Sequence, residues 1–140
     1  MTHAPTVEQR PDIDIHSEID HLIAHYPPLQ HDRHQMTITV ESGVVTVRGN
    51  LQSPMTHRYL LNSLPDVPGV VAVNAEALYD DGTIRLDAGR VVPPGVMVAR
   101  VNYGLVVLSG HLPEGTAQEA VVGAVAQIPG VTQVVTGFDN

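Results

Sequence analysis

Residues 36–51 read MTITVESGVVTVRGNL, and residues 97–112 read MVARVNYGLVVLSGHL. The similarity extends through residues 36–79 and 97–140, which align without a gap at an offset of 61. Ten aligned pairs are identical, and all of them are apolar residues, glycine or proline: Met36/Met97, Val40/Val101, Gly43/Gly104, Val45/Val106, Gly49/Gly110, Leu51/Leu112, Pro68/Pro129, Gly69/Gly130, Val70/Val131 and Val73/Val134. Such a repeat is typical of a duplicated structural unit. Because no reactive group recurs, the repeat predicts a fold and not a chemistry.

Each copy opens with the pattern of a β-hairpin. In the first copy, apolar and polar residues alternate through residues 36–41 and again through residues 45–48, with a Ser-Gly turn between them. Glycines stand where the turn needs a left-handed backbone and where the second strand ends in a sharp exit or a bulge: Gly43, Gly104, Gly49 and Gly110.

A helix and a third strand complete each copy. Ser53-Pro54 combines a capping side chain with proline at the first helical position, so a helix is expected to begin there. In the second copy apolar residues recur at helical spacing: Ala117, Ala120, Val121, Ala124, Val125 and Ile128. Pro-Gly pairs containing Gly69 and Gly130 end the helices and turn the chain. Residues 70–75 and 131–136 are predicted as the third strands.

The repeated positions resemble the BON domain, a small α/β module of bacterial envelope and osmotic-stress proteins. The matching residues of the two copies are Val40, Gly43, Val45, Val47, Gly49, Leu51, Pro68, Gly69, Val70 and Val73, and then Val101, Gly104, Val106, Leu108, Gly110, Leu112, Pro129, Gly130, Val131 and Val134. The resemblance implies two tandem BON-like modules of α+β class, with mixed small sheets each packed against a helix. The expected order is αββαβ in the first module and ββαβ in the second.

The domain organisation follows from the repeat and from the segments around it. A capping box at Ser17 and Asp20 predicts a leading helix for the first module that stops at the two prolines Pro27 and Pro28. No leading helix is predicted for the second module, whose approach reads as a turn, a short strand and an extended segment. The predicted divisions are a flexible tail (1–14), module 1 (15–79), a linker (80–94) and module 2 (95–140).

Charge and composition restrict the partners and the location. Fifteen acidic residues against seven arginines give a net charge of −8, and the arginines are scattered, so nucleic acid is excluded as a partner and an anionic membrane surface is disfavoured. The chain has no cysteine, which excludes disulfides, thiolate chemistry and Cys-ligated zinc. No signal peptide or membrane span is visible, which predicts a cytoplasmic protein, or a periplasmic one if the sequence begins after a removed signal.

His21 and His25 are the candidate metal ligands, because residues four apart share one face of a helix. Zn, Ni or Cu would need a further ligand, for which His31 or Asp32 is available. The alternative, which the apolar residues on the neighbouring helix face favour, is a solvated helix surface with only adventitious divalent binding.

The second hairpin carries the candidate interaction surface. The outer face of the first hairpin is polar, whereas the aligned positions of the second hairpin include Val98, Leu105 and Val107. Both faces of the second sheet are therefore expected to be covered, by the first module, by residues 84–92 or by another chain.

The sequence supports three classes of function to different degrees. The first is a non-enzymatic binding or scaffolding protein that acts through protein contacts or self-association; the BON resemblance implies association with the envelope or with osmotic stress. The second, which the resemblance also implies, is binding of potassium or of a phospholipid surface, and the acidic charge favours the cation. The third, an enzyme, is not expected: Asp80 and Asp81 should bind backbone amides, and Ser109 lacks a nucleophile elbow.

Overall fold

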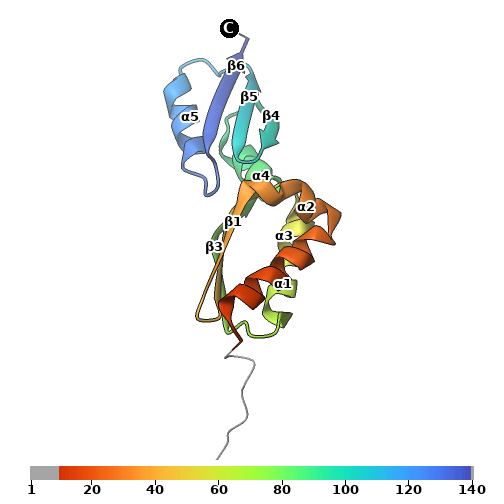
Figure 1. Ribbon diagram of the computed structural model, residues 1–140. Helices are drawn as coiled ribbons and strands as arrows, with labels where there is room; N and C mark the ends of the chain where they lie inside the picture. The colour runs from red at the N-terminus through yellow and green to blue at the C-terminus, as the bar shows by residue number, and fades with distance from the viewer. Residues whose placement is uncertain (1–9, 140) are drawn as a thin grey trace, which may run out of the picture. The chain divides into compact units, whose positions relative to one another are not determined.

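The computed structural model describes residues 10–139 and consists of two compact units, module 1 and module 2 (Figure 1). Module 1 comprises the chain up to Leu78 without residues 52–54, and module 2 comprises those three residues and the chain from Tyr79 onward. The elements up to this boundary are α1 (Asp12–Ala24), α2 (Pro27–Asp32), the 3-10 helix η2 (Arg33–Gln35), β1 (Met36–Glu41), β2 (Val44–Leu51), α3 (Pro54–Ser63), the 3-10 helix η3 (Leu64–Asp66) and β3 (Ala72–Asp80).

Module 2 repeats the order helix, hairpin, helix and strand. Its elements are α4 (Asp81–Val91), β4 (Val96–Asn102), β5 (Leu105–Gly110), α5 (Gln118–Ala126) and β6 (Gln133–Phe138). The strand orders are β1-β2-β3 and β4-β5-β6, with antiparallel hairpins and with β6 parallel to β5. The α+β class, with small three-stranded sheets packed against helices, is confirmed. The predicted glycines all have positive φ: Gly43, Gly49, Gly69, Gly104, Gly110 and Gly130.

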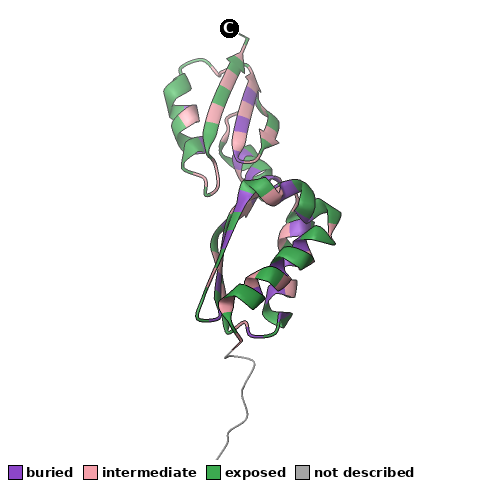
Figure 2. Ribbon diagram, viewed as in Figure 1, coloured by how far each residue is buried: buried purple, intermediate pink, exposed green. Residues whose placement is uncertain are grey.

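Each module has its own aliphatic core, built from alternate strand residues and one face of each helix. In module 1 the α1 residues Ile15, Ile19 and Ile23 are buried with Val45 and Val47 of β2. In module 2 the buried cluster consists of Ile84, Ala88, Val96, Val106, Leu108, Val121 and Val125. Figure 2 shows that the central strand β5 carries buried residues, whereas the edge strand β6 carries only exposed and intermediate ones.

Residues 80–94 are not a linker, because they contain α4, and the prediction that the second module lacks its leading helix is wrong. Asp80 accepts hydrogen bonds from the backbone N–H and the hydroxyl of Thr83, at 2.7 and 3.1 Å, and so caps the helix. Ile84 and Ala88, four residues apart, are buried in the core of module 2. This burial stabilises a helix whose sequence, with two glycines, has a low intrinsic helix propensity.

The first helix also begins earlier than predicted. α1 starts at Asp12, so the predicted tail, residues 1–14, is too long, and residues 1–9 lie outside the described part of the chain. The predicted capping box at Ser17 lies within the helix, and the residue that precedes the helix is Pro11, which makes no side-chain cap. The early start has a structural reason, because Asp12 binds the hairpin turn of its own module, as described below.

The other predicted boundaries are correct in part. α3 begins at Pro54, as predicted, and the third strands begin two residues later than expected, but β3 continues to Asp80, five residues beyond its predicted end. The backbone N–H groups of Val70 and Val131 donate to Val67 and Ile128, at 3.1 Å each, which places these residues in turns before the strands.

Candidate protein-interaction surface

The outer face of the β4-β5-β6 sheet, which points away from the core of module 2, carries two of the three predicted surface residues. Leu105 and Val107 lie on this face and are half-buried. Val98 does not lie on it: it pairs with Leu108, which is fully buried, and packs against the core. The prediction for Val98 is therefore wrong.

A β-bulge in β4 explains why Val98 faces the core. The register of β4 against β5 shifts between Val98 and Arg100, so Ala99 is an extra residue. An extra residue reverses the faces occupied by the residues that precede it. Met97 is consequently 60% exposed, although Met36, its identical partner in the gapless alignment, is 5% exposed.

The outer face of module 2 presents apolar side chains from all three strands, among polar neighbours that include Asn102, Ser109 and Gln133. Met97 of β4 and Val135 of β6 are 60% and 39% exposed, and Leu105 and Val107 of β5 lie between them. Arg100 is the only charged residue in the three strands. The corresponding face of the module 1 hairpin is mostly polar, with Thr37, Thr39, Glu41, Thr46 and Arg48, and its one apolar residue is Val44, the counterpart of Leu105. Residues 84–92, one of the predicted covers, belong mainly to α4, whose buried residues pack in the core on the opposite side.

Each leading helix begins with an aspartate that holds the hairpin turn of its own module. The Asp12 carboxylate accepts hydrogen bonds from the backbone N–H groups of residues 42 and 43, at 2.7 and 2.9 Å. The Asp81 carboxylate accepts them from residues 103 and 104, again at 2.7 and 2.9 Å. The predicted role of Asp80 and Asp81 as ligands of backbone amides is confirmed. These carboxylates stabilise the fold and are engaged in that role.

The leading helices form a second repeat that sequence comparison missed. At an offset of 69, and not 61, the pairs are Asp12/Asp81, Ile15/Ile84, His16/Arg85 and Ile19/Ala88. The different offset arises because α2 and η2 lie between helix and hairpin in module 1 and have no counterpart in module 2. The recurrent aspartate, followed by apolar residues three and seven positions later, is the signal that could have identified α4.

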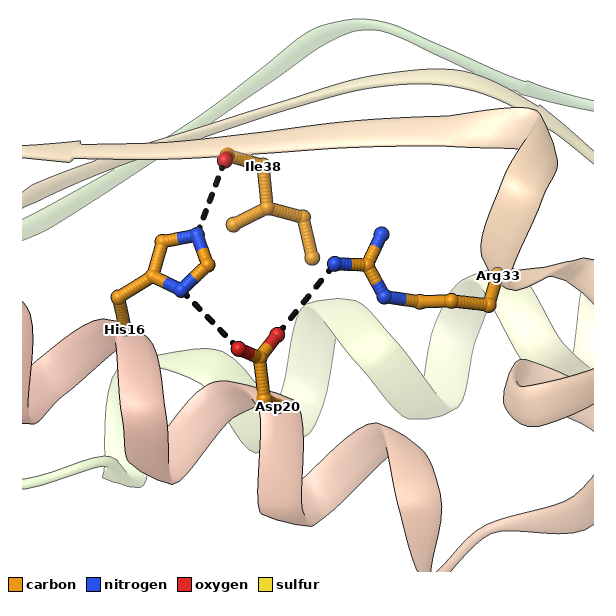
Figure 3. Close-up of polar contacts among 4 residues, drawn as sticks. All are labelled: His16, Asp20, Arg33 and Ile38. Atoms are coloured by element: carbon orange, nitrogen blue, oxygen red, sulfur yellow. Dashed lines mark hydrogen bonds and ion pairs between the residues drawn. The ribbon is translucent and has the colours of Figure 1, made fainter.

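The residues of one of these pairs, His16 and Arg85, each contact the first strand of the hairpin in their own module. His16 Nε2 lies 3.3 Å from the carbonyl oxygen of Ile38 in β1, and its other ring nitrogen lies 3.2 Å from Asp20, which Arg33 contacts at 3.4 Å (Figure 3). In module 2, Arg85 donates to the carbonyl of Val98 in β4, at 3.0 Å. Both leading helices thus place a polar side chain on the first strand of the hairpin.

The predicted metal ligands, His21 and His25, lie together at the end of α1. The rings of His21 and His25 stack, with centroids 5.2 Å apart, and His25 Nδ1 lies 2.7 Å from the carbonyl oxygen of His21. Both residues are exposed. Within residues 10–139, no three His, Cys, Asp or Glu side chains are grouped so that they could hold a metal ion. The geometry therefore offers at most a two-ligand surface contact, which is weak for zinc.

No helix in the described part of the chain has the length and apolar character needed to cross a bilayer.

Comparison with known proteins gives a family match in module 2 and solved structures of similar fold. Residues 85–139 match the BON domain family, so a BON domain is found in module 2. The fold is similar to that of CdsD, a structural protein of the type III secretion system of Chlamydia trachomatis, with a TM-score of 0.66, 17% identity, and coverage of 91% of this chain and 62% of that chain. A structure of the C-terminal domain of CdsD gives a TM-score of 0.66 and 18% identity, with 87% and 63% coverage. A search of curated proteins gives no match.

At these identities the similarity to CdsD concerns the fold alone. The chain also spans less than two thirds of the length of either CdsD structure.

Proposed function

We propose that the chain is a non-enzymatic scaffold of two tandem BON-type modules, and that the outer sheet face of module 2 binds protein. The BON domain in residues 85–139 and the fold shared with a structural protein of a secretion system support a scaffolding or binding role. The observation that carries the proposal is the apolar outer face of the β4-β5-β6 sheet.

The tandem arrangement is supported by repeated contacts as well as by repeated sequence. In both modules an aspartate at the start of the leading helix binds the hairpin turn, at the same pair of distances. In both, the residue four positions later contacts a carbonyl of the first strand. Shared contacts of this kind indicate duplication of one module, and module 1 is on this basis proposed to be a BON-type module too.

The composition of the outer face favours a protein partner. Exposed apolar patches on sheets are uncommon on monomeric proteins and commonly mark interaction sites. The face holds Met97, Leu105, Val107 and Val135 in a chain of net charge −8, and the only charge in its strands is Arg100. An interface core depleted of charge and enriched in methionine has the composition expected for protein contacts.

A photo-cross-linking experiment tests this proposal. A benzophenone amino acid replaces Met97 in the cells that produce the protein, and adducts are identified by mass spectrometry. The matched control carries the probe at Thr37, which occupies the same place on the polar face of module 1 and is also exposed. We expect a discrete protein adduct at Met97 that is absent at Thr37. Equal adducts at both positions, lipid adducts only, or no adduct at Met97 in a folded variant would each refute the proposal.

A further inference from the structure

A groove between α4 and α5 of module 2 has a volume of about 340 Å³. Its walls include the apolar side chains of Val91, Ala124 and Ile128, and Asp87 and Pro129 line it as well. Val91 is 44% exposed, and Ile128 is half-buried. The groove therefore leaves apolar surface and a carboxylate open on the helical side of the module.

The residues that line this groove have counterparts in module 1. The corresponding pairs are Glu18/Asp87 and Leu22/Val91 at the helix offset of 69, and Val67/Ile128 and Pro68/Pro129 at the hairpin offset of 61. In both modules a carboxylate of the leading helix is thus combined with apolar residues and with the Pro-Gly turn before the third strand. The chemical character of the groove is part of the repeat.

Module 1 fills these positions with a side chain of its own, Arg10. Its Nη1 atom donates to Glu18 Oε1 at 2.6 Å and to the carbonyl oxygen of Pro68 at 3.0 Å. Val67, in the same turn, is only 5% exposed. Arginine is suited to such a place, because its planar guanidinium donates in several directions while its alkyl stem packs on apolar surface.

Module 2 has the acceptors of this contact without the arginine. At the offset of 69, the counterpart of Arg10 is Tyr79. Tyr79 packs against the core of module 2, and a Cβ added at Gly130 would lie 2.7 Å from its Cβ and Cγ atoms, so its ring is already placed and carries no positive charge. Within residues 10–139, the carbonyl oxygen of Pro129 accepts no hydrogen bond.

Arg90 does not take the place of Arg10. It contacts Asp87 Oδ1 at 3.2 Å from the same helix, and its side chain is 73% exposed, so the pair is a weak surface contact that uses one carboxylate oxygen. In module 1 the same position holds His21, which lines a hollow together with Arg10. A basic neighbour is therefore compatible with an arginine beside the carboxylate.

From the repeated groove we infer that module 2 binds an arginine side chain of a partner protein between α4 and α5. The guanidinium would donate to the Asp87 carboxylate and to the Pro129 carbonyl oxygen, and the alkyl stem would pack on Val91. Charge complementarity favours this partner, because guanidinium–carboxylate bonds are charge-assisted and the chain has a net charge of −8. The α-carboxylate of free arginine would be repelled by the same charge. The groove lies between helices and is a second surface, distinct from the outer sheet face.

An NMR titration of the isotope-labelled full chain tests the inference. The probe is the blocked tripeptide acetyl-Gln-Arg-Pro-amide, which has the sequence of residues 9–11. We expect saturable shifts at the amides of Val91 and Ile128, with a dissociation constant on the order of 1 mM, because one side chain is bound. The same peptide with citrulline, which lacks the charge, should bind at least about ten times more weakly. Equal binding of both peptides, no saturable shift at the groove, or tighter binding of free arginine would overturn the inference.

A change of one carboxylate locates the contact. Asp87→Asn should weaken peptide binding roughly ten- to hundredfold, the effect of losing a hydrogen bond to a charged group. The matched control, Glu119→Gln, makes the same change of charge at an exposed position of α5 and should leave binding unchanged. Equal weakening in both variants would mean that the peptide is attracted only by the acidity of the chain, and the inference would be wrong.

Arg10→Ala tests the argument from the repeat. This variant frees the Glu18 carboxylate and the Pro68 carbonyl oxygen, so the peptide should bind at two sites, with new shifts at the amides of Glu18 and Val67. If the peptide could not replace Arg10 in its own place, an arginine from another molecule would not occupy such a groove, and the inference would fall. The adduct at Met97 tests the outer face separately, so either proposal can fail without the other.

Discussion

Gly110→Ala is expected to destabilise module 2 by about 2 to 5 kcal/mol. Gly110 ends β5 with φ of +96°, and an added Cβ would overlap the carbonyl oxygen of Gly95. That carbonyl accepts a hydrogen bond of 2.8 Å from His111, so the backbone cannot move without breaking a contact at the entry to β4. Left-handed strain costs roughly 1–2 kcal/mol, and overpacking roughly 1–3 kcal/mol. Urea denaturation with amide hydrogen exchange, read separately for each module, measures the loss.

Two further glycine-to-alanine variants show whether the loss of stability is caused by the close backbone approach. Gly49→Ala should have the same effect in module 1, because a Cβ there would overlap the carbonyl oxygen of Gln35 just before β1. Gly123→Ala is the matched control, since Gly123 lies within α5 and an added Cβ meets nothing within 4 Å. Because alanine has a higher helix propensity than glycine, this variant should be more stable than the wild type by about 0.5–1 kcal/mol. If the Gly110→Ala and Gly123→Ala variants were equally stable, the close backbone approach at Gly110 would not explain why both copies have glycine at this position.

The parts of the fold that the sequence predicts correctly are those encoded by local periodicity. Alternation through residues 36–48 specifies a hairpin because each residue is buried or exposed in turn, and Gly43 marks its turn because only a left-handed backbone closes it. Pro54 marks the start of α3 for an equally local reason. Features of this kind need no knowledge of tertiary contacts.

α4 could not be found from propensity, because tertiary burial stabilises it. Gly82 and Gly89 weaken the helical pattern, and only two core positions, Ile84 and Ala88, lie on its buried face besides the turn-binding Asp81. The comparison of the copies missed it as well, because the offset of 61 that aligns the hairpins does not align the leading helices.

The candidate site was predicted in part. Leu105 and Val107 lie on the outer face because the alternation of β5 is regular, whereas Val98 faces the core because of a bulge that alternation alone does not reveal.

Asp81→Ala is expected to destabilise module 2 by about 2 to 4 kcal/mol. The Asp81 side chain is 6% exposed and accepts two short hydrogen bonds from the turn between β4 and β5. A hydrogen bond to a charged group contributes about 1.5–3 kcal/mol, and a buried donor left without an acceptor costs about 1–3 kcal/mol. Loss of both bonds also frees a turn whose residues Tyr103 and Gly104 have positive φ. Urea denaturation gives the change in free energy, and hydrogen exchange of these two amides should accelerate the most.

Comparison with two other aspartates separates the turn contact from the loss of a negative charge. Asp87→Ala, on the same helix, removes a carboxylate whose partner is the exposed Arg90, at 3.2 Å, and should cost about 0.5 kcal/mol or less. Asp12→Ala removes the equivalent turn contact in module 1 and should cost less than Asp81→Ala, because Asp12 is less buried and water can replace its bond to the exposed amide of Ser42. The expected order of destabilisation is therefore Asp81, then Asp12, then Asp87. An Asp81→Ala variant as stable as Asp87→Ala would mean that the hairpin turn closes without the leading helix. The contact between helix and turn would then not stabilise the module in which it occurs.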